Sequence, residues 1–273
     1  MTSITPFRVR IDAPAPVIGM VHLPALPGAP DFDGDRDVIR ERALADARRL
    51  EAGGVDALML ENFGDAPFYP EAVPRHVVAE LTALAASVSD AVDCPLGINV
   101  LRNDAESALS IAAAVDADFI RVNVHVGTAA TDQGVLEGKA HETLRLRNRL
   151  EADVAVLADI HVKHATPIGE TTLEQAALET VERGRADGII VSGAGTGEET
   201  ARTDLDCVAD AVGDRVPVLV GSGITPDTVG DRLEAGADGV IVGTALKAGG
   251  ETTNVVSRER VEAVVEAARA AGQ

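Results

Sequence analysis

VAVLADIHVKH, residues 154–164, changes from an apolar run into a series of ionisable side chains. The run of Val, Ala and Leu predicts a buried parallel strand. Successive strand side chains point to opposite faces, so Asp159, His161 and Lys163 share one face if the strand continues through them. A core strand with a solvated polar end is the common alternative, but three titratable side chains on one face are costly to bury without partners. We therefore predict that this strand ends at a functional site.

Similar apolar segments recur along the chain, and each is followed by a stretch with helical character. The expected strands span residues 17–21, 57–60, 96–101, 118–124, 154–164, 188–191, 218–220 and 239–242. The expected helices end near Ala52, Val92 and Leu150, start after the capping residue Asp104, or span residues 173–183, 204–212, 226–235 and 257–270. Gly53 and Gly54 supply the turn that ends the first of these helices. Eight alternations without a linker predict one (β/α)8 TIM barrel over residues 1–273.

The composition excludes several classes of partner. The net charge of −20 repels phosphates over most of the surface, which argues against binding to nucleic acids or anionic membranes. Only three lysines accompany this acidic excess, so we expect a halophilic, salt-rich cytosol in which charge repulsion is screened. Cys94 and Cys207 form no disulfide framework. No signal peptide or long apolar span is visible, and a cytoplasmic protein is expected.

Polar side chains gather after the predicted strands. Barrel enzymes carry their active sites at this end of the barrel. The candidate substrate-binding residues of the first four strand ends are His22, Asn99, Arg102, Arg121, Asn123 and His125, and Glu61 joins Asp159, His161 and Lys163 as a candidate catalytic residue. The segments that precede the strands, in contrast, are plain helix ends.

Two glycine-containing triplets, GSG (221–223) and VGT (242–244), follow the last two strands. Glycine lets backbone N–H groups approach an anion closely, and this position is the usual phosphate site of barrel enzymes. Phosphate is therefore expected at Ser222, Gly223, Gly243 and Thr244. The segment SGAGTG (192–197), with Ser192, Gly193 and Thr196, either extends this phosphate site or forms a mobile flap.

The histidines do not form a recognisable metal motif. No His-x-His follows the first strand, and no His-Glu-x-x-His occurs, so a divalent metal is conceivable but not favoured. No Gly-x-Ser-x-Gly or Cys–His signature supports a covalent nucleophile. We expect no cofactor apart from inorganic phosphate as a co-substrate.

Eight stretches resemble the BtpA/SgcQ family over nearly the whole chain. They are GMVHLPALPG, LENFGDAPF, GINVLRNDA, FIRVNVHVG, TDQGVLEG, LADIHVKH, IIVSGAGTG and VGSGITP. The resemblance implies a phosphate-binding barrel similar to those of ribose-phosphate metabolism. The family takes its name from photosystem I biogenesis, but its occurrence in non-photosynthetic organisms implies a more general activity.

The expected reaction is phosphorolysis of a ribonucleoside, such as a purine nucleoside, to ribose 1-phosphate and free base. This reaction needs a bound phosphate, an acid for the departing base and hydrogen bonds to the sugar. Lys163 or Arg121 would assist the phosphate site, and Asn99, Asn123 and Glu61 would hold ribose. Asp159 with His161 is the expected acid/base pair.

Two alternatives stay open at the level of sequence. One is an isomerase or aldolase-like enzyme that acts on a sugar phosphate, with Lys163 as the base or as the Schiff-base residue. The other is a non-catalytic assembly factor, which has no need for a convergent ionisable cluster. We expect a homo-oligomer that binds a small ribosyl or sugar-phosphate molecule rather than a nucleic acid or a membrane.

Overall fold

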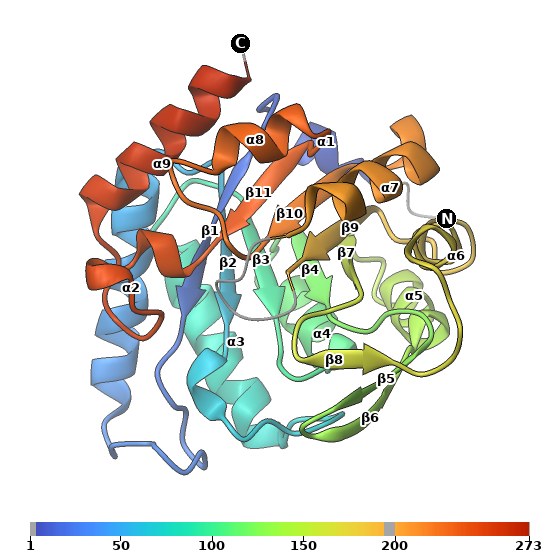
Figure 1. Ribbon diagram of the computed structural model, residues 1–273. Coiled ribbons are helices and arrows are strands. Elements are labelled where there is room, and N and C mark those ends of the chain that lie inside the picture. The colour runs from blue at the N-terminus through green and yellow to red at the C-terminus, as the bar shows by residue number, and fades with distance from the viewer. Residues whose placement is uncertain (1–3, 194–199, 273) are drawn as a thin grey trace.

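Eight parallel strands close into a barrel in the computed structural model, which describes residues 4–193 and 200–272 (Figure 1). The strands pair in the order β1-β2-β3-β4-β7-β9-β10-β11, and β11 returns to β1 through the pair Val17 and Val240. These barrel strands are β1 (Val17–His22), β2 (Ala57–Glu61), β3 (Leu96–Asn99), β4 (Phe119–Val122), β7 (Ala155–Ile160), β9 (Gly188–Ser192), β10 (Val218–Gly221) and β11 (Gly239–Val242). The predicted (β/α)8 barrel is confirmed.

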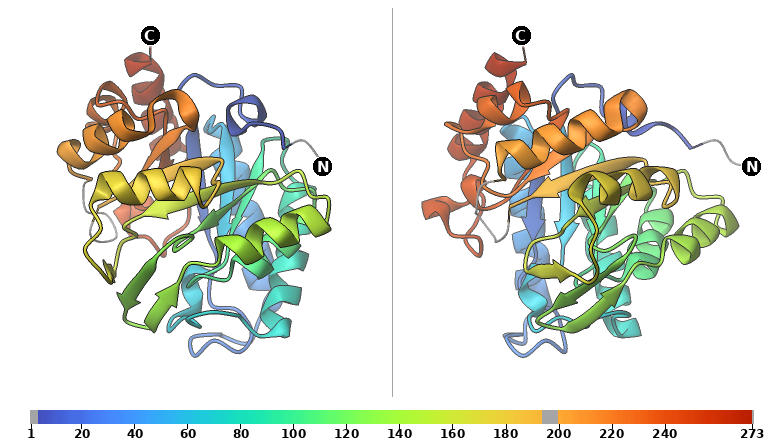
Figure 2. Two further views of the ribbon diagram at one scale, coloured as in Figure 1. Left: turned by 90° about the vertical axis from the view of Figure 1, so that its right-hand side faces the viewer. Right: turned by 45° about the vertical axis from the view of Figure 1, so that its right-hand side comes forward.

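Helices surround the barrel in each of the views of Figure 2. They are α2 (Arg36–Ala52), α3 (Arg75–Ser89), α4 (Ala105–Ala114), α5 (Ala140–Arg149), α6 (Leu173–Glu182), α7 (Arg202–Val212), α8 (Val229–Glu234) and α9 (Arg258–Ala271). Asp104 caps α4 as expected, because its carboxylate accepts a hydrogen bond from the Ser107 amide at 2.9 Å. At the end of α2, Gly54 adopts a φ of 89°, a left-handed conformation that favours glycine.

The barrel interior is filled by apolar side chains near the amino ends of its strands. Phe119 of β4 lies across this interior, and Gly97 of β3 leaves room for it, since a Cβ at Gly97 would lie 2.1 Å from Phe119 Cε2. Phe7 of the short helix α1 (Phe7–Arg10) meets the ring of Phe119 edge-on, with ring centroids 5.4 Å apart. This end of the barrel is therefore closed by packing, while the polar side chains gather at the carboxyl ends.

Strand β7 ends earlier than the sequence predicted. It stops at Ile160, and His161 adopts a left-handed φ of 51° that is incompatible with a strand. Strands β3 and β4 likewise end at Asn99 and Val122, two residues before the expected ends at Leu101 and Val124. Side-chain alternation therefore does not extend from Asp159 to His161 and Lys163.

A small antiparallel sheet replaces the long connection expected over residues 127–138. It pairs β6 (Gly134–Glu137), β5 (Thr128–Thr131) and β8 (Ala165–Pro167), and it lies beside the barrel (Figures 1 and 2). Short 3-10 helices occur at η1 (Phe63–Asp65), η2 (Gly213–Arg215), η3 (Thr244–Leu246) and η4 (Ala248–Gly250). Among the described residues, no helix has the length and apolar character that crossing a membrane requires.

Candidate active site

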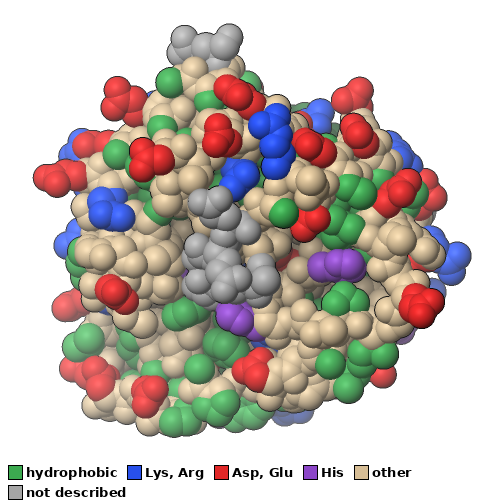
Figure 3. Space-filling model, viewed as in Figure 1, with side chains coloured by type: hydrophobic (Ala, Val, Ile, Leu, Met, Phe, Trp, Pro, Cys, Tyr) green, Lys and Arg blue, Asp and Glu red, His purple; other side chains and the backbone are tan. Residues whose placement is uncertain are grey.

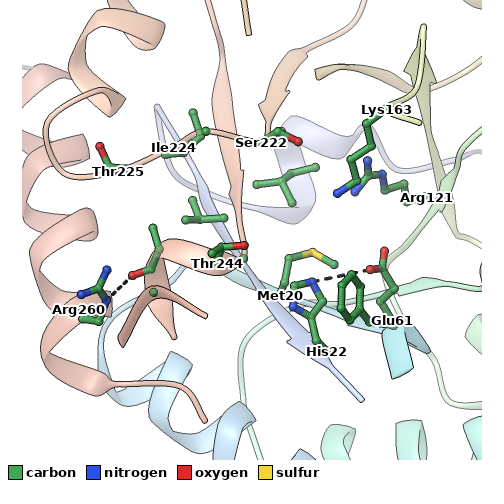
Figure 4. A pocket seen from close by; sticks show the side chains of 18 residues that line it. Met20, His22, Glu61, Arg121, Lys163, Ser222, Ile224, Thr225, Thr244 and Arg260 are labelled. Carbon is green, nitrogen blue, oxygen red and sulfur yellow. Dashed lines mark hydrogen bonds and ion pairs between the residues drawn. The ribbon is translucent and has the colours of Figure 1, made fainter. Parts of the chain in front are cut away.

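A cavity of about 220 Å3 opens at the carboxyl ends of β1, β10 and β11. Its lining consists of Met20, His22, Glu61, Phe63, Arg121, Lys163, residues 221–225, residues 241–245, Gly250 and Arg260. In Figure 4, Arg121 and Lys163 lie to one side of the cavity, Thr225 and Arg260 lie to the other, and Thr244 lies between them. The cavity therefore occupies the position at which barrel enzymes carry their active sites.

The loops after β10 and β11 offer backbone donors to this cavity. Ser222 and Gly223 adopt positive φ angles of 75° and 67°. Toward the part of the chain that the structure describes, the amides of Gly223 and Gly243 donate no hydrogen bond. A Cβ at Gly243 would lie 2.8 Å from His22 Cε1, so a side chain there would fill the space between this loop and His22. Two amides that donate to no described acceptor, beside an open space, favour the binding of an anion.

The charges of the cavity lining are opposite in sign to those of the whole molecule. The chain carries 44 Asp and Glu against 24 Lys and Arg, and acidic side chains are spread over the face seen in Figure 3. The described part of the cavity lining, in contrast, contains the cations Arg121, Lys163 and Arg260 and one carboxylate, Glu61. An anionic ligand is therefore attracted to the cavity although most of the protein surface repels it.

Arg121 and Asp159 form a buried bidentate ion pair beside the cavity. Arg121 Nε and Nη2 donate to the two Asp159 carboxylate oxygens at 2.9 and 2.8 Å. Asn123 Nδ2 and Ser192 Oγ donate to the same carboxylate at 2.9 and 3.4 Å. Burial lowers the pKa of Arg121, but the Asp159 carboxylate outweighs this effect and raises the pKa overall. Asp159 thus lies within hydrogen-bond reach of several side chains, as predicted, and it fixes the Arg121 guanidinium.

Lys163 reaches the same cavity from the loop that follows β7. No hydrogen bond links its ammonium group to the residues that the structure describes, whereas its carbonyl accepts one from Arg102 Nη2. Burial lowers the pKa of Lys163, and the nearby Arg121 lowers it further. Lys163 is therefore an available ammonium group that gives up its proton more readily than a lysine in water.

Glu61, His22 and Phe63 line the part of the cavity that lies next to Arg121. His22 Nε2 lies 3.7 Å from Glu61 Oε1, and its ring lies 4.7 Å from that of Phe63, measured between centroids. Burial lowers the pKa of His22 well below 6.5, and the charges of Lys247 and Lys163 add to the effect. The imidazole is therefore neutral at pH 7, and a carboxylate, a neutral ring and an aromatic face meet at one place.

The predicted asparagine and histidine ligands of the central strands are used inside the protein. Asn99 Nδ2 donates to the Arg121 carbonyl at 3.0 Å and to Asn123 Oδ1 at 3.2 Å. His125 Nε2 lies 2.9 Å from the Gly184 carbonyl oxygen. None of Asn99, Asn123 and His125 belongs to the cavity lining. They support the Arg121 and Asp159 pair or the barrel wall.

The expectation that His161 shares a face with Lys163 is wrong. His161 is exposed and lines a second cavity of about 90 Å3, together with Asn123, Asp159 and residues of β5, β8 and α6. The strand ends one residue before His161, so its side chain takes a different direction from the one that alternation predicts. Asp159 and Lys163 remain close enough for the Asp159 charge to offset part of the lowering of the Lys163 pKa.

The segment after β9 is only partly described. Ser192 contacts Asp159, and Gly193 is buried. Thr196 lies outside the described residues, so the expectation that this segment extends the phosphate site stays a prediction. Ser222, Gly223, Gly243 and Thr244, by contrast, all line the cavity together, as the two glycine triplets indicated.

Arg260 is the charged cavity residue that sequence reasoning missed, and Phe63 and Thr225 were not predicted either. Arg260 belongs to the first turn of α9, and its Nε donates to the Ala245 carbonyl at 2.7 Å. No local motif marks it, because it meets the loop after β11 only through the packing of the closing helix. Lys247, which did follow a predicted strand, is fully buried, and its Nζ donates to the Met20 carbonyl at 3.0 Å.

No group of three His, Cys, Asp or Glu side chains suited to a metal ion occurs in the part of the chain described. His22 of the cavity lining packs against the tilted ring of Phe63, and His125, outside the lining, contacts the Gly184 carbonyl. The absence of a metal requirement stays a prediction.

The geometry is accompanied by clear similarity to known proteins. The photosystem I biogenesis protein BtpA of Synechocystis is 48% identical over 252 residues, which cover 92% of this chain and 87% of that protein. The putative sgc region protein SgcQ of Escherichia coli is 33% identical over 253 residues, which cover 92% of each protein.

Solved barrels share the fold at low sequence identity. Thiamine phosphate pyrophosphorylase of Pyrococcus furiosus has a TM-score of 0.61 at 14% identity and covers 96% of this chain and 98% of that chain. Phosphoribosyl anthranilate isomerase of Thermus thermophilus has a TM-score of 0.58 at 14% identity, over 93% and 98% of the two chains. The sequence itself matches the BtpA family over residues 13–270, and the chain therefore belongs to that family.

Proposed function

We propose that the protein is an enzyme that phosphorolyses a ribonucleoside to ribose 1-phosphate and free base. The observation that carries this proposal is a cavity lined by Arg and Lys, with two backbone amides that donate to no described acceptor, at the mouth of the barrel of a chain whose net charge is −20. The names of its structural neighbours support it, since one acts on a thiamine phosphate and another on a phosphoribosyl compound.

The proposed reaction needs no covalent bond between the protein and the substrate. The bond between the sugar C1 and the base nitrogen breaks, its electron pair leaves with the base, and a phosphate oxygen forms the new bond to C1. The sugar passes through a cation-like state that a neighbouring phosphate stabilises, and the departing nitrogen needs a proton. Positioning and electrostatics therefore supply most of the rate.

The described side chains fit these roles. The amides of Gly223 and Gly243, with the Ser222 and Thr244 hydroxyls, would bind phosphate oxygens, and Arg260 would balance their charge. Lys163 is our candidate proton donor, because its lowered pKa brings its proton closer to the working pH. Asp159 would act as a positioning residue, since both of its oxygens already accept hydrogen bonds from other side chains.

A second reaction class is favoured by one specific observation. Lys163 has a lowered pKa and donates no hydrogen bond to a described residue, so it is also suited to form a Schiff base with a sugar-phosphate carbonyl, with loss of water. The protein would then be an isomerase or aldolase-type enzyme. Borohydride reduction in the presence of substrate would attach the sugar covalently to Lys163, and it would attach nothing there during phosphorolysis.

The test is a panel of purine and pyrimidine ribonucleosides, incubated with the full chain at high salt, with and without inorganic phosphate. We expect release of free base that depends on phosphate, with ribose 1-phosphate as the second product. Lys163→Gln should reduce the rate by about 10²- to 10³-fold, because it removes a group that acts on the transition state. Lys139→Gln is the matched control, since Lys139 lies at the surface and pairs with Glu71.

The other outcomes separate the alternatives. Base release without phosphate would indicate hydrolysis and would contradict the proposed role of the anion site. Turnover of a sugar phosphate but of no nucleoside would favour the isomerase or aldolase class. An absence of any turnover would favour a non-catalytic assembly role, which is suggested by the name of the Synechocystis relative.

A further inference from the structure

Glu61 is an isolated carboxylate on the wall of the cavity. Its residue is 4% exposed, yet no hydrogen bond from any described donor reaches its carboxylate oxygens. Its nearest ion-pair partner is His22 Nε2, at 3.7 Å, which is beyond hydrogen-bond distance. An ionised carboxylate only accepts hydrogen bonds, so both of its oxygens are available for donors from a ligand.

The surroundings keep Glu61 available. His22 is neutral at pH 7 because burial lowers its pKa, so it does not form a full ion pair with the carboxylate. Arg121 is committed to Asp159 through two hydrogen bonds. Lys163 and Arg102 experience the charge of Glu61, which acts to raise their pKa, but neither donates a hydrogen bond to it among the described contacts.

The other polar side chains expected to hold a sugar are not available. Asn99 and Asn123 bond to each other, and their remaining partners are the Arg121 carbonyl and Asp159. Glu61 is the carboxylate of the described cavity lining, and no described donor reaches its oxygens. Beside it, Phe63 presents an apolar ring, which suits the C–H face of a sugar.

We propose that Glu61, flanked by His22 and Phe63, binds the vicinal cis-diol of a ribosyl group, and that it makes the cavity select ribosyl over 2-deoxyribosyl ligands. The two hydroxyls of the diol donate to the two carboxylate oxygens. A 2-deoxy ligand lacks one donor and leaves a buried acceptor unpaired, which is costly. This inference rests on the proposed function, because it assumes that the sugar lies beside the phosphate site.

The experiment measures binding rather than turnover. Ribose 1-phosphate, ribose 5-phosphate and their 2-deoxy counterparts are titrated into the full chain at high salt by calorimetry. We expect the preferred ribose phosphate to bind roughly 10- to 100-fold more tightly than its 2-deoxy analogue, because a hydrogen bond to a charged group is lost. Glu61→Gln should remove most of this preference by weakening the ribose phosphate, while the 2-deoxy compound changes little.

Glu174→Gln is the matched control, because Glu174 is exposed in the first turn of α6. Equal binding of the two sugars to the wild-type chain would overturn the proposal, and so would an unchanged preference in Glu61→Gln or a failure of every sugar phosphate to bind. If Glu61→Gln does not fold, the wild-type preference alone decides. A clear preference without nucleoside turnover would leave the diol site intact and would contradict phosphorolysis alone.

Discussion

The two sides of the barrel mouth differ in whether their hydrogen-bonding groups already have partners within the protein. On the glycine side, the loops after β10 and β11 present backbone amides of Gly223 and Gly243 that are free among the described contacts. On the charged side, the ends of β4 and β7 present Arg121 and Asp159, which are engaged with each other. We infer that the glycine side keeps its donors for a ligand. On the charged side, Arg121 and Asp159 are already hydrogen-bonded to each other, and Lys163 extends from the loop beside them.

The largest effect on stability should follow from removing the Arg121 and Asp159 ion pair on the charged side. Arg121→Met leaves Asp159 buried without its cation, and an uncompensated buried charge typically lowers the free energy of unfolding by about 3 to 5 kcal/mol. Chemical denaturation at fixed salt measures this change. Arg36→Met is the control, because Arg36 is exposed where it pairs with Glu80, and the pair should contribute less than about 1 kcal/mol. An equal decrease in the free energy of unfolding in the two variants would mean that the buried Arg121 and Asp159 pair contributes no more than an exposed ion pair.

A smaller effect is expected on the glycine side. Gly243→Ala places a Cβ close to His22 Cε1, so either the loop or the ring must move, and phosphate should bind roughly 10- to 100-fold more weakly. The free energy of unfolding should change less than it does in Arg121→Met. Gly230→Ala in α8 is the matched control, since its Cβ would meet only Ala271 Cβ at 3.6 Å. Unchanged phosphate affinity in Gly243→Ala would remove this loop from the anion site.

The sequence predicted the features that depend on local contacts and missed those that depend on residues far apart in the chain. The glycine side was predicted from two local triplets, because backbone donors at strand ends depend on the segment itself. The charged side was predicted in its residue types but not in its arrangement. His161 has a left-handed φ, so the strand ends before it, and its side chain does not share a face with Asp159 and Lys163 as predicted. Arg260 joins the cavity only through long-range packing of α9, which no local pattern encodes.

The pH dependence of turnover sharpens the contrast further. Burial and Arg121 lower the pKa of Lys163, so its proton is lost at a pH below the range of a free lysine. If Lys163 protonates the leaving base, kcat/KM falls as the pH rises through this lowered pKa. A profile from pH 7 to 10 at constant ionic strength measures the effect, with Lys139→Gln as the control. Activity that stays constant or rises over this range would exclude Lys163 as the acid.

The smallest expected effect is that of chelators. The described residues offer no three-ligand cluster for a metal, and our proposal routes no step through one. Extended dialysis against a chelator should therefore leave turnover and phosphate affinity unchanged. If turnover is lost and one divalent ion restores it, the reaction requires that metal ion.

The central claim is that the glycine side holds an anion, and a diffraction structure of the protein grown in phosphate tests it most directly. Our account predicts a phosphate ion within hydrogen-bond distance of the amides of Gly223 and Gly243, with Arg260 on the same side of the cavity. A cavity without phosphate, or one in which carbonyl oxygens rather than amides face the open space, would contradict it.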